Sequence, residues 1–140
     1  MNNKNALLII DMQQEDGFVL EHFDSVVANT AFLLETARQQ RVPILYTRHV
    51  NPADGSDLPP GGPRAPYGGP SGYRAGTRQV EIIESLAPQP AETVIDKGRY
   101  SAFHRTDLDA RLKALAVHTL TTCGVLTDVC VLTTASDAFA

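Results

Sequence analysis

Short apolar runs alternate along the chain with longer segments of helical periodicity. The clearest run, at 6–10, reads Ala-Leu-Leu-Ile-Ile and has no polar residue, which is typical of a strand buried on both faces of a sheet. The segment at 25–38 instead has apolar residues about one helical turn apart, and Asp24 or Ser25 can cap it. The alternation predicts strands connected by helices.

The same pattern extends over the whole sequence. Strands are expected at 6–10, 42–47, 93–95 and 119–123. Helices are expected at 25–38, 77–86, 108–117 and 128–140. Strands that alternate with helices form βαβ units and a mainly parallel sheet. We therefore predict a three-layer α/β/α sandwich, as a single domain over 1–140.

A long segment at 51–76 interrupts this order. It holds seven of the ten glycines and six of the nine prolines, so we expect a loop. Long loops inside a domain are usually functional, as lids or binding loops. A passive excursion over the surface is the alternative.

The sequence stops within the last helical pattern, without a Gly or Asn stop signal. Four strands make a small doubly wound sheet, and the strand at 119–123 would leave an uncovered edge. We therefore expect a C-terminally truncated domain, continued in the natural protein by at least one strand and one helix. Otherwise a homo-oligomer supplies the cover.

Composition narrows the class of protein. Hydrophobic residues make up 43% of the chain, and its longest apolar run is too short to span a bilayer. The net charge of −4, without a basic cluster, argues against nucleic acid or a membrane as partner. The two cysteines lack zinc-site spacing, and no signal peptide is visible. A cytoplasmic protein without a cofactor is expected.

Chemically capable side chains follow each predicted strand. Asp11 follows the first, Arg48 and His49 the second, Lys97 the third, and Cys130 lies in the segment after the fourth. In open parallel sheets, sites form outside the carboxyl ends of the strands. An acid, a base and a thiol are therefore expected to meet at one edge.

Cys130 has the position of a reactive thiol. With Thr127 as N-cap it is the third residue of a helix, where orphan N–H groups and the helix dipole favour a thiolate and lower its pKa. A buried structural thiol is the alternative, and is the interpretation that we favour for Cys123. Asp11 taken alone fits a turn cap, and Lys97 a surface lysine.

Three motifs in this sequence resemble those of the isochorismatase-like cysteine hydrolases, which include nicotinamidases and N-carbamoylsarcosine amidohydrolases. They are Leu-Leu-Ile-Ile-Asp-Met-Gln-Gln at 7–14, Ile-Asp-Lys-Gly-Arg-Tyr-Ser-Ala-Phe at 95–103 with Thr-Asp-Leu at 106–108, and Cys-Gly-Val-Leu-Thr-Asp-Val-Cys-Val at 123–131. The resemblance covers 6–140 and implies a Rossmann-like topology.

The resemblance implies a catalytic triad of Asp11, Lys97 and Cys130. Cys130 would attack a carbonyl carbon, Asp11 would shuttle protons, and Lys97 would stabilise the ionised pair. The family has a cis peptide at the position matching 125–126, which implies that the backbone N–H groups of Leu126 and Cys130 form the oxyanion hole. A non-proline cis bond is costly and usually functional.

Other matching positions concern the substrate. Phe18 and Phe103 match residues that often line the pocket, although core packing also explains them. Nicotinamidases carry Asp-x-His as part of a metal site, whereas this sequence has His49-Val50-Asn51. We therefore expect no metal, and His49 either binds substrate or is an ordinary loop residue.

The leading hypothesis is a hydrolase of the C–N bond in a small amide, carbamoyl or ureido compound, acting through an acyl-enzyme on Cys130. An isochorismate-type vinyl-ether hydrolase is one alternative, although such enzymes do not need this thiol. A non-catalytic binding or scaffold module of the same fold is another.

Overall fold

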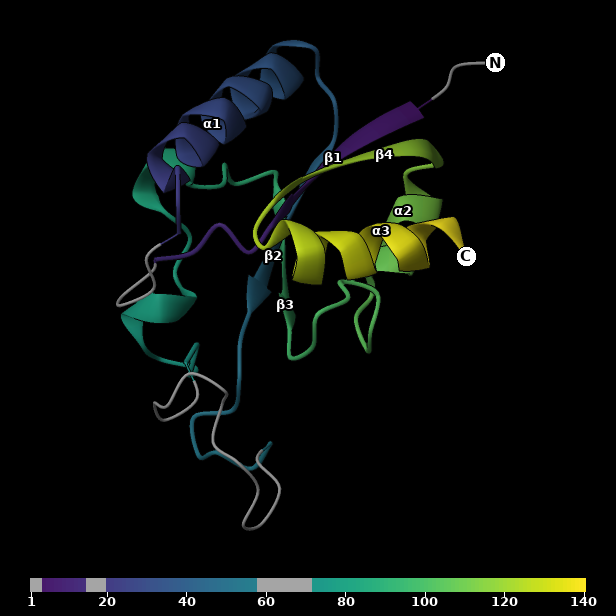
Figure 1. Cartoon of the computed structure of the whole chain (residues 1–140). Coiled ribbons are helices and arrows are strands. Elements are labelled where there is room, and N and C mark those ends of the chain that lie inside the picture. The colour runs from purple at the N-terminus through teal and green to yellow at the C-terminus, as the bar shows by residue number, and fades with distance from the viewer. Residues whose placement is uncertain (1–3, 15–19, 58–71) are drawn as a thin grey trace.

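The computed structural model describes residues 4–14, 20–57 and 72–140. Within them the chain forms one parallel sheet in the order β3-β2-β1-β4 (Figure 1). Its strands are β1 (Lys4–Ile10), β2 (Ile44–His49), β3 (Thr93–Lys97) and β4 (Val117–Gly124). β1 lies inside the sheet, as its wholly apolar run requires, and residues 6–10 are at most 3% exposed.

Helices cover both faces of this sheet. α1 (Phe23–Gln39) lies on one side, and α2 (Leu108–Ala114) and α3 (Leu132–Phe139) lie on the other (Figure 1). The predicted three-layer α/β/α sandwich is therefore confirmed. Alternate residues of the strands belong to two hydrophobic cores, one on each face of the sheet. Leu8 and Ile10 pack in the layer of α2, whereas Leu7 and Ile9 pack against α1.

The prediction of a helix at 77–86 is wrong. The segment forms two short 3₁₀ turns, Arg78–Val80 and Glu84–Leu86, with extended backbone between them. Ile82 pairs in antiparallel fashion with Gln13, so the backbone hydrogen bonds of this stretch go to the chain beyond β1 rather than along a helix. The apolar spacing that suggested a helix reflects burial of Val80 and Leu86 instead.

Helix starts also differ from the prediction. A π-helical turn, Thr127–Val131, precedes α3, and its N-cap is Leu126 rather than Thr127. The N-cap of α1 is His22, in the left-handed region at φ 59°, and its side chain makes no capping hydrogen bond. Before α2, Thr106 Oγ1 accepts a hydrogen bond from the Leu108 N–H at 3.3 Å.

Gly124 closes β4 in a position that only glycine can occupy. Its φ is 131°, and an added Cβ would lie 2.0 Å from the Ile10 carbonyl oxygen. The same carbonyl accepts the Val125 N–H at 3.1 Å. The close approach of these two strand ends brings the segment before Cys130 to the end of β1.

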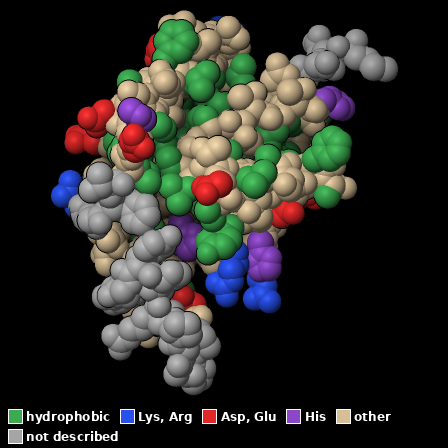
Figure 2. Space-filling model, viewed as in Figure 1, with side chains coloured by type: hydrophobic (Ala, Val, Ile, Leu, Met, Phe, Trp, Pro, Cys, Tyr) green, Lys and Arg blue, Asp and Glu red, His purple; other side chains and the backbone are tan. Residues whose placement is uncertain are grey.

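Apolar side chains are exposed over α1 and α3 (Figure 2), among them Phe32 and Leu132, which are 73% and 56% exposed. β4 is one of the two edge strands of the described sheet. The expected homo-oligomer and the expected C-terminal continuation stay predictions.

None of the described helices is both long and apolar enough to cross a membrane.

Candidate active site

The strands place three polar side chains on one face. Leu45 of β2 and Ile95 of β3 pack in the core beside α2 and α3. Because side chains alternate along a strand, Thr47 and His49 share the face of Leu45, and Lys97 shares that of Ile95. His49 and Lys97 are paired in register at the carboxyl ends of their strands.

Asp11 reaches this face through an unusual backbone conformation. Strict alternation after β1 would place it with Leu7 and Ile9, toward α1. Its φ is 53°, in the left-handed region that Asp tolerates better than most residues. Its carboxylate instead contacts Thr47 and Lys97 and is buried.

Lys97 lies between the other two members of the predicted triad. Its Nζ is 2.7 Å from Asp11 Oδ2 and 3.7 Å from Cys130 Sγ. It also donates to the Arg99 carbonyl oxygen at 2.9 Å. The lysine is 3% exposed, so it is not the solvated surface residue that its sequence position also allowed. The structure therefore brings all three residues together.

The Cys130 thiol is buried beside this ion pair, at 9% exposure. Burial, together with the negative charge of Asp11, raises its pKa to about 11, and Lys97 only partly offsets them. The lowered pKa predicted from the position at a helix start is therefore wrong, because burial and the Asp11 carboxylate outweigh the stabilisation of a thiolate by Lys97. The resting residue is a thiol, and forming a thiolate requires a base.

A free backbone donor lies close to Cys130 in sequence. The peptide bond between Val125 and Leu126 is cis, as the family resemblance implied. Within the described part of the chain, the Leu126 N–H has no hydrogen-bond acceptor, whereas its carbonyl accepts from Val129 and Val131. A free N–H at this position is a donor of the kind that an oxyanion hole requires.

Gln13 is a buried residue beside the candidate site, and its role was not predicted from the sequence. It is fully buried, and its Nε2 donates to the carbonyl oxygens of His49 and Val80 at 3.0 and 3.2 Å. Its Oε1 accepts the His49 N–H at 2.8 Å. A buried amide at the end of β1 therefore ties β2 to the segment that contains Val80. Its place in the 7–14 motif was the available signal.

His49 lies in a polar corner next to the triad. Its ring packs edge-on against Tyr73 at 5.7 Å and hydrogen-bonds with the Asn51 side chain. Burial, followed by the positive charge of Lys97, holds the pKa of His49 below its ordinary value. The residue is therefore a neutral hydrogen-bonding group at neutral pH.

His49 should make the fold sensitive to acid. Its pKa is lower in the folded than in the unfolded chain, so only the unfolded chain gains this proton as the pH falls below about 6.5. The free energy of unfolding should therefore decrease between pH 7 and pH 5. The decrease should be smaller in His49→Gln, measured by urea unfolding at both pH values. Equal decreases would contradict the assignment.

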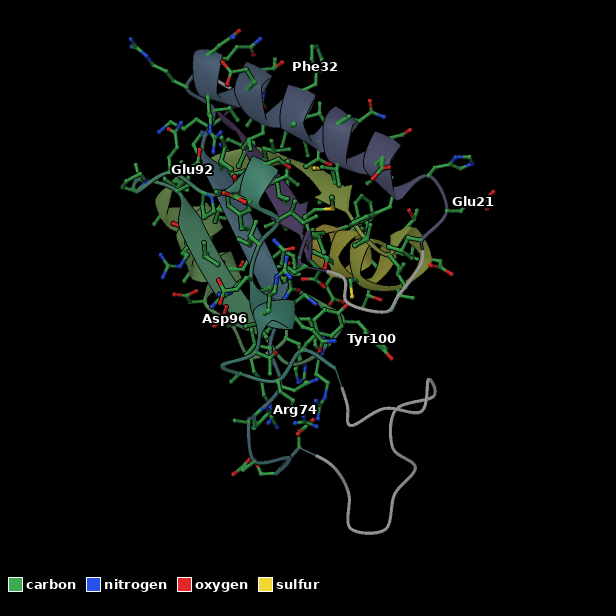
Figure 3. The ribbon with its side chains drawn as sticks, turned by 90° about the vertical axis from the view of Figure 1, so that its left-hand side faces the viewer. Glu21, Phe32, Arg74, Glu92, Asp96 and Tyr100 are labelled. Atoms are coloured by element: carbon green, nitrogen blue, oxygen red, sulfur yellow. The ribbon has the colours of Figure 1, made fainter. Side chains whose placement is uncertain are left out.

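The remaining predicted residues lie elsewhere. Arg48 does not contact the three residues of the predicted triad but pairs with Asp96 at 2.7 Å, and Asp96 lies on the outer strand β3 (Figure 3). Phe103 packs on the core cluster that contains Cys130, but it lines a hollow of about 530 Å³ with residues of α2 and α3, and none of the triad lines this hollow. Phe18 lies outside the described residues.

The loop at 51–76 is described only at its two ends. The Asn51 N–H donates to the Tyr73 carbonyl, and Arg74 forms an ion pair with Asp57 at 2.5 Å. Arg74 therefore lies beyond the carboxyl end of β2, on the side of the molecule away from α1 (Figure 3). The two ends of the loop are thus held together beside the candidate site.

Within the described residues, the positions that match the metal-binding motif offer few ligands for a metal. In the ranges that the structure describes, no three His, Cys, Asp or Glu side chains are grouped as ligands. Asn51 uses its amide to donate to the Gly72 carbonyl at 2.9 Å. Of the pair that matches the metal-binding motif, only His49 has a strong metal-binding donor.

The fold and the positions of Asp11, Lys97 and Cys130 define an α/β protein with a buried thiol at the carboxyl edge of its sheet. The sequence model of the isochorismatase domain matches residues 5–140. The chain therefore belongs to the isochorismatase family.

Curated relatives have different names. Enterobactin synthase component B of Escherichia coli K12 is 35% identical, over 96% of this chain and 47% of its own length. The ureidoacrylate amidohydrolase RutB of Agrobacterium fabrum is 30% identical, over 98% of this chain and 70% of its own. The chain thus spans about half the length of the first of these relatives.

Solved structures with the same fold include two hydrolases. A cysteine hydrolase from Pseudomonas syringae pv. phaseolicola 1448A superposes with a TM-score of 0.86 at 35% identity, covering 97% of this chain and 66% of that one. N-carbamoylsarcosine amidase from Thermoplasma acidophilum gives 0.80 at 26% identity, covering 96% and 75%.

Proposed function

We propose that this chain is the catalytic part of a cysteine hydrolase that cleaves the C–N bond of a small amide, carbamoyl or ureido compound. The observation that carries the proposal is the position of Lys97, whose ammonium is 2.7 Å from Asp11 and 3.7 Å from the Cys130 thiol. A nucleophile, a base and a cation in mutual contact have the arrangement of an activated nucleophile. The amidohydrolase names of two relatives support this reaction class.

In the first half of the reaction, Asp11 takes the proton of the Cys130 thiol. The thiolate attacks the carbonyl carbon of the substrate, and the negative charge that forms on oxygen is stabilised by the backbone N–H groups of Leu126 and Cys130. Asp11 then returns the proton to the leaving nitrogen, and the C–N bond breaks. An acyl group remains on Cys130, and the amine departs.

In the second half, water hydrolyses this thioester. Asp11 accepts a proton from the water as the hydroxide adds to the acyl carbon, and that proton returns to the departing sulfur. Lys97 retains its charge throughout and stabilises whichever of its two neighbours is ionised. In the proposed reaction, His49 hydrogen-bonds the substrate, and its lowered pKa, which keeps it neutral, supports this role.

Two alternatives remain within the fold. The match to the isochorismatase domain favours a vinyl-ether hydrolase, but that reaction makes no use of a thiol held between a carboxylate and an ammonium. A binding or scaffold module of the same fold would need none of the three groups. The buried ion pair beside Cys130 therefore favours the amide-cleaving hydrolase.

A substrate panel tests the proposal. Primary amides, N-carbamoyl amino acids, ureido acids and isochorismate would be incubated with the protein, with release of ammonia or pyruvate as readout. Ammonia release that requires Cys130 supports the amidohydrolase. Pyruvate release from isochorismate that persists in Cys130→Ala would establish the vinyl-ether reaction instead.

Activity is expected to survive metal removal. Asn51 supplies no strong ligand beside His49, so turnover should remain within about twofold of the untreated protein after dialysis against EDTA. The measurement is the initial rate on the best substrate of the panel, with and without added zinc or iron. A chelated protein that is inactive and regains activity with either ion would show that the metal-free assignment is wrong.

A further inference from the structure

Thr47 holds the proposed base of the reaction at two points. Its hydroxyl donates to Asp11 Oδ1 at 2.7 Å, and its carbonyl oxygen accepts the Asp11 N–H at 3.2 Å. Both side chains are buried, with Thr47 at 1% exposure. Water therefore does not compete for the Thr47 hydroxyl, which donates its hydrogen bond to the Asp11 carboxylate.

The two carboxylate oxygens consequently have different surroundings. Oδ1 accepts from Thr47, whereas Oδ2 faces the Lys97 ammonium and, within the described residues, accepts no well-aligned hydrogen bond. The ammonium is also the group that contacts Cys130 Sγ. Rotation of the carboxylate about its last bond would exchange the two oxygens, and the Thr47 hydrogen bond opposes that rotation.

We infer that Thr47 is a positioning residue, which fixes the Asp11 carboxylate so that Oδ2 takes the Cys130 proton. In that step the S–H bond breaks, an O–H bond forms at Oδ2, and the electron pair stays on sulfur. The inference rests on the proposed function for the identity of the base. Thr47 contacts neither the thiol nor Lys97 through any hydrogen bond in the described chain, so it acts through Asp11.

Variants at position 47 separate the hydroxyl from the shape of the side chain. Thr47→Val removes the donor and keeps the volume, whereas Thr47→Ser keeps the donor. The matched control is Thr30→Val, since Thr30 is an equally buried threonine whose hydroxyl hydrogen-bonds with Cys123, in the layer of α1. Should Thr47→Val fail to fold, Thr47→Ala and Thr47→Ser form a second pair that differs in the hydroxyl alone.

The first readout is alkylation of Cys130 by iodoacetamide as a function of pH, resolved from Cys123 by peptide mass spectrometry. It requires no substrate, so it tests Thr47 even where the panel identifies none. Thr47→Val should slow Cys130 alkylation at neutral pH about tenfold, because the Asp11 carboxylate is no longer held in the orientation in which Oδ2 takes the thiol proton. Thr47→Ser and Thr30→Val should match the wild-type rate.

The second readout is turnover. Thr47→Val should lower kcat about 10-fold to 100-fold with KM nearly unchanged, and should move the acidic limb of the rate profile to higher pH. The inference is overturned if Thr47→Val keeps the wild-type alkylation rate and the wild-type pH profile. It is also overturned if Thr47→Ser shows the same defects as Thr47→Val. If the wild-type protein is inactive on the whole panel but shows the expected alkylation pattern, the proposed function is wrong, whereas the positioning role of Thr47 is supported.

Discussion

Replacing Cys130 by alanine should lower the proposed amidase activity at least about 10³-fold, because Cys130 is the group that forms the acyl intermediate in the proposed reaction. The fold should persist. The thiol is small and belongs to a core cluster, so its loss should cost no more than about 2 kcal/mol of unfolding free energy. The measurements are steady-state kinetics on the best substrate, and urea unfolding.

Cys123→Ala is the matched control for this variant. Cys123 packs in the other core, against the layer of α1, and its burial also raises its pKa to about 11. A general need for a buried thiol would affect both variants, whereas a nucleophile affects only one. Full activity in folded Cys130→Ala, or an equal loss in Cys123→Ala, would contradict the nucleophilic role.

The sheet and the meeting of the three catalytic candidates could be predicted because simple rules determine them. A wholly apolar run such as 6–10 is compatible only with a buried strand or helix, and its length favours the strand. Parallel strands then bring their carboxyl ends to one edge, which places Asp11, Lys97 and the Cys130 segment near one another. Neither step depends on a particular side-chain contact.

The details that depend on tertiary contacts could not be predicted in this way. Asp11 reaches the site because its backbone is left-handed, and the alternation rule alone would place it on the wrong face. The stretch at 77–86 has helical spacing, yet Gln13 and the backbone of Met12 and Gln14 take its hydrogen bonds. In each case a contact distant in sequence overrides the local pattern.

The Cys130 pKa shows how two correct local arguments can give the wrong sign. A helix start and a nearby lysine both favour a thiolate. Burial and the Asp11 carboxylate disfavour it by more, and the extent of burial is visible only once the fold is known. The direction of this shift agrees with the proposal that Asp11 acts as the base, because a thiol that is not ionised at rest needs one.

Replacing Lys97 by methionine should remove turnover and also destabilise the fold. The side chain is fully buried, and its ammonium is the ion-pair partner of the Asp11 carboxylate. Met keeps most of the volume but leaves that carboxylate buried without its cation. Breaking a buried pair in this way typically costs about 3–5 kcal/mol, so the free energy of unfolding by urea at pH 7 should fall by that amount.

A double-mutant cycle distinguishes this ion pair from simple loss of packing. Asp11→Asn alone leaves the ammonium buried without its counter-charge and should also destabilise the protein. Lys97→Met with Asp11→Asn removes both charges, so the double variant should be more stable than either single variant and still inactive. If the two losses of stability simply add, the residues are not coupled, and the buried ion pair does not account for the destabilisation of either single variant.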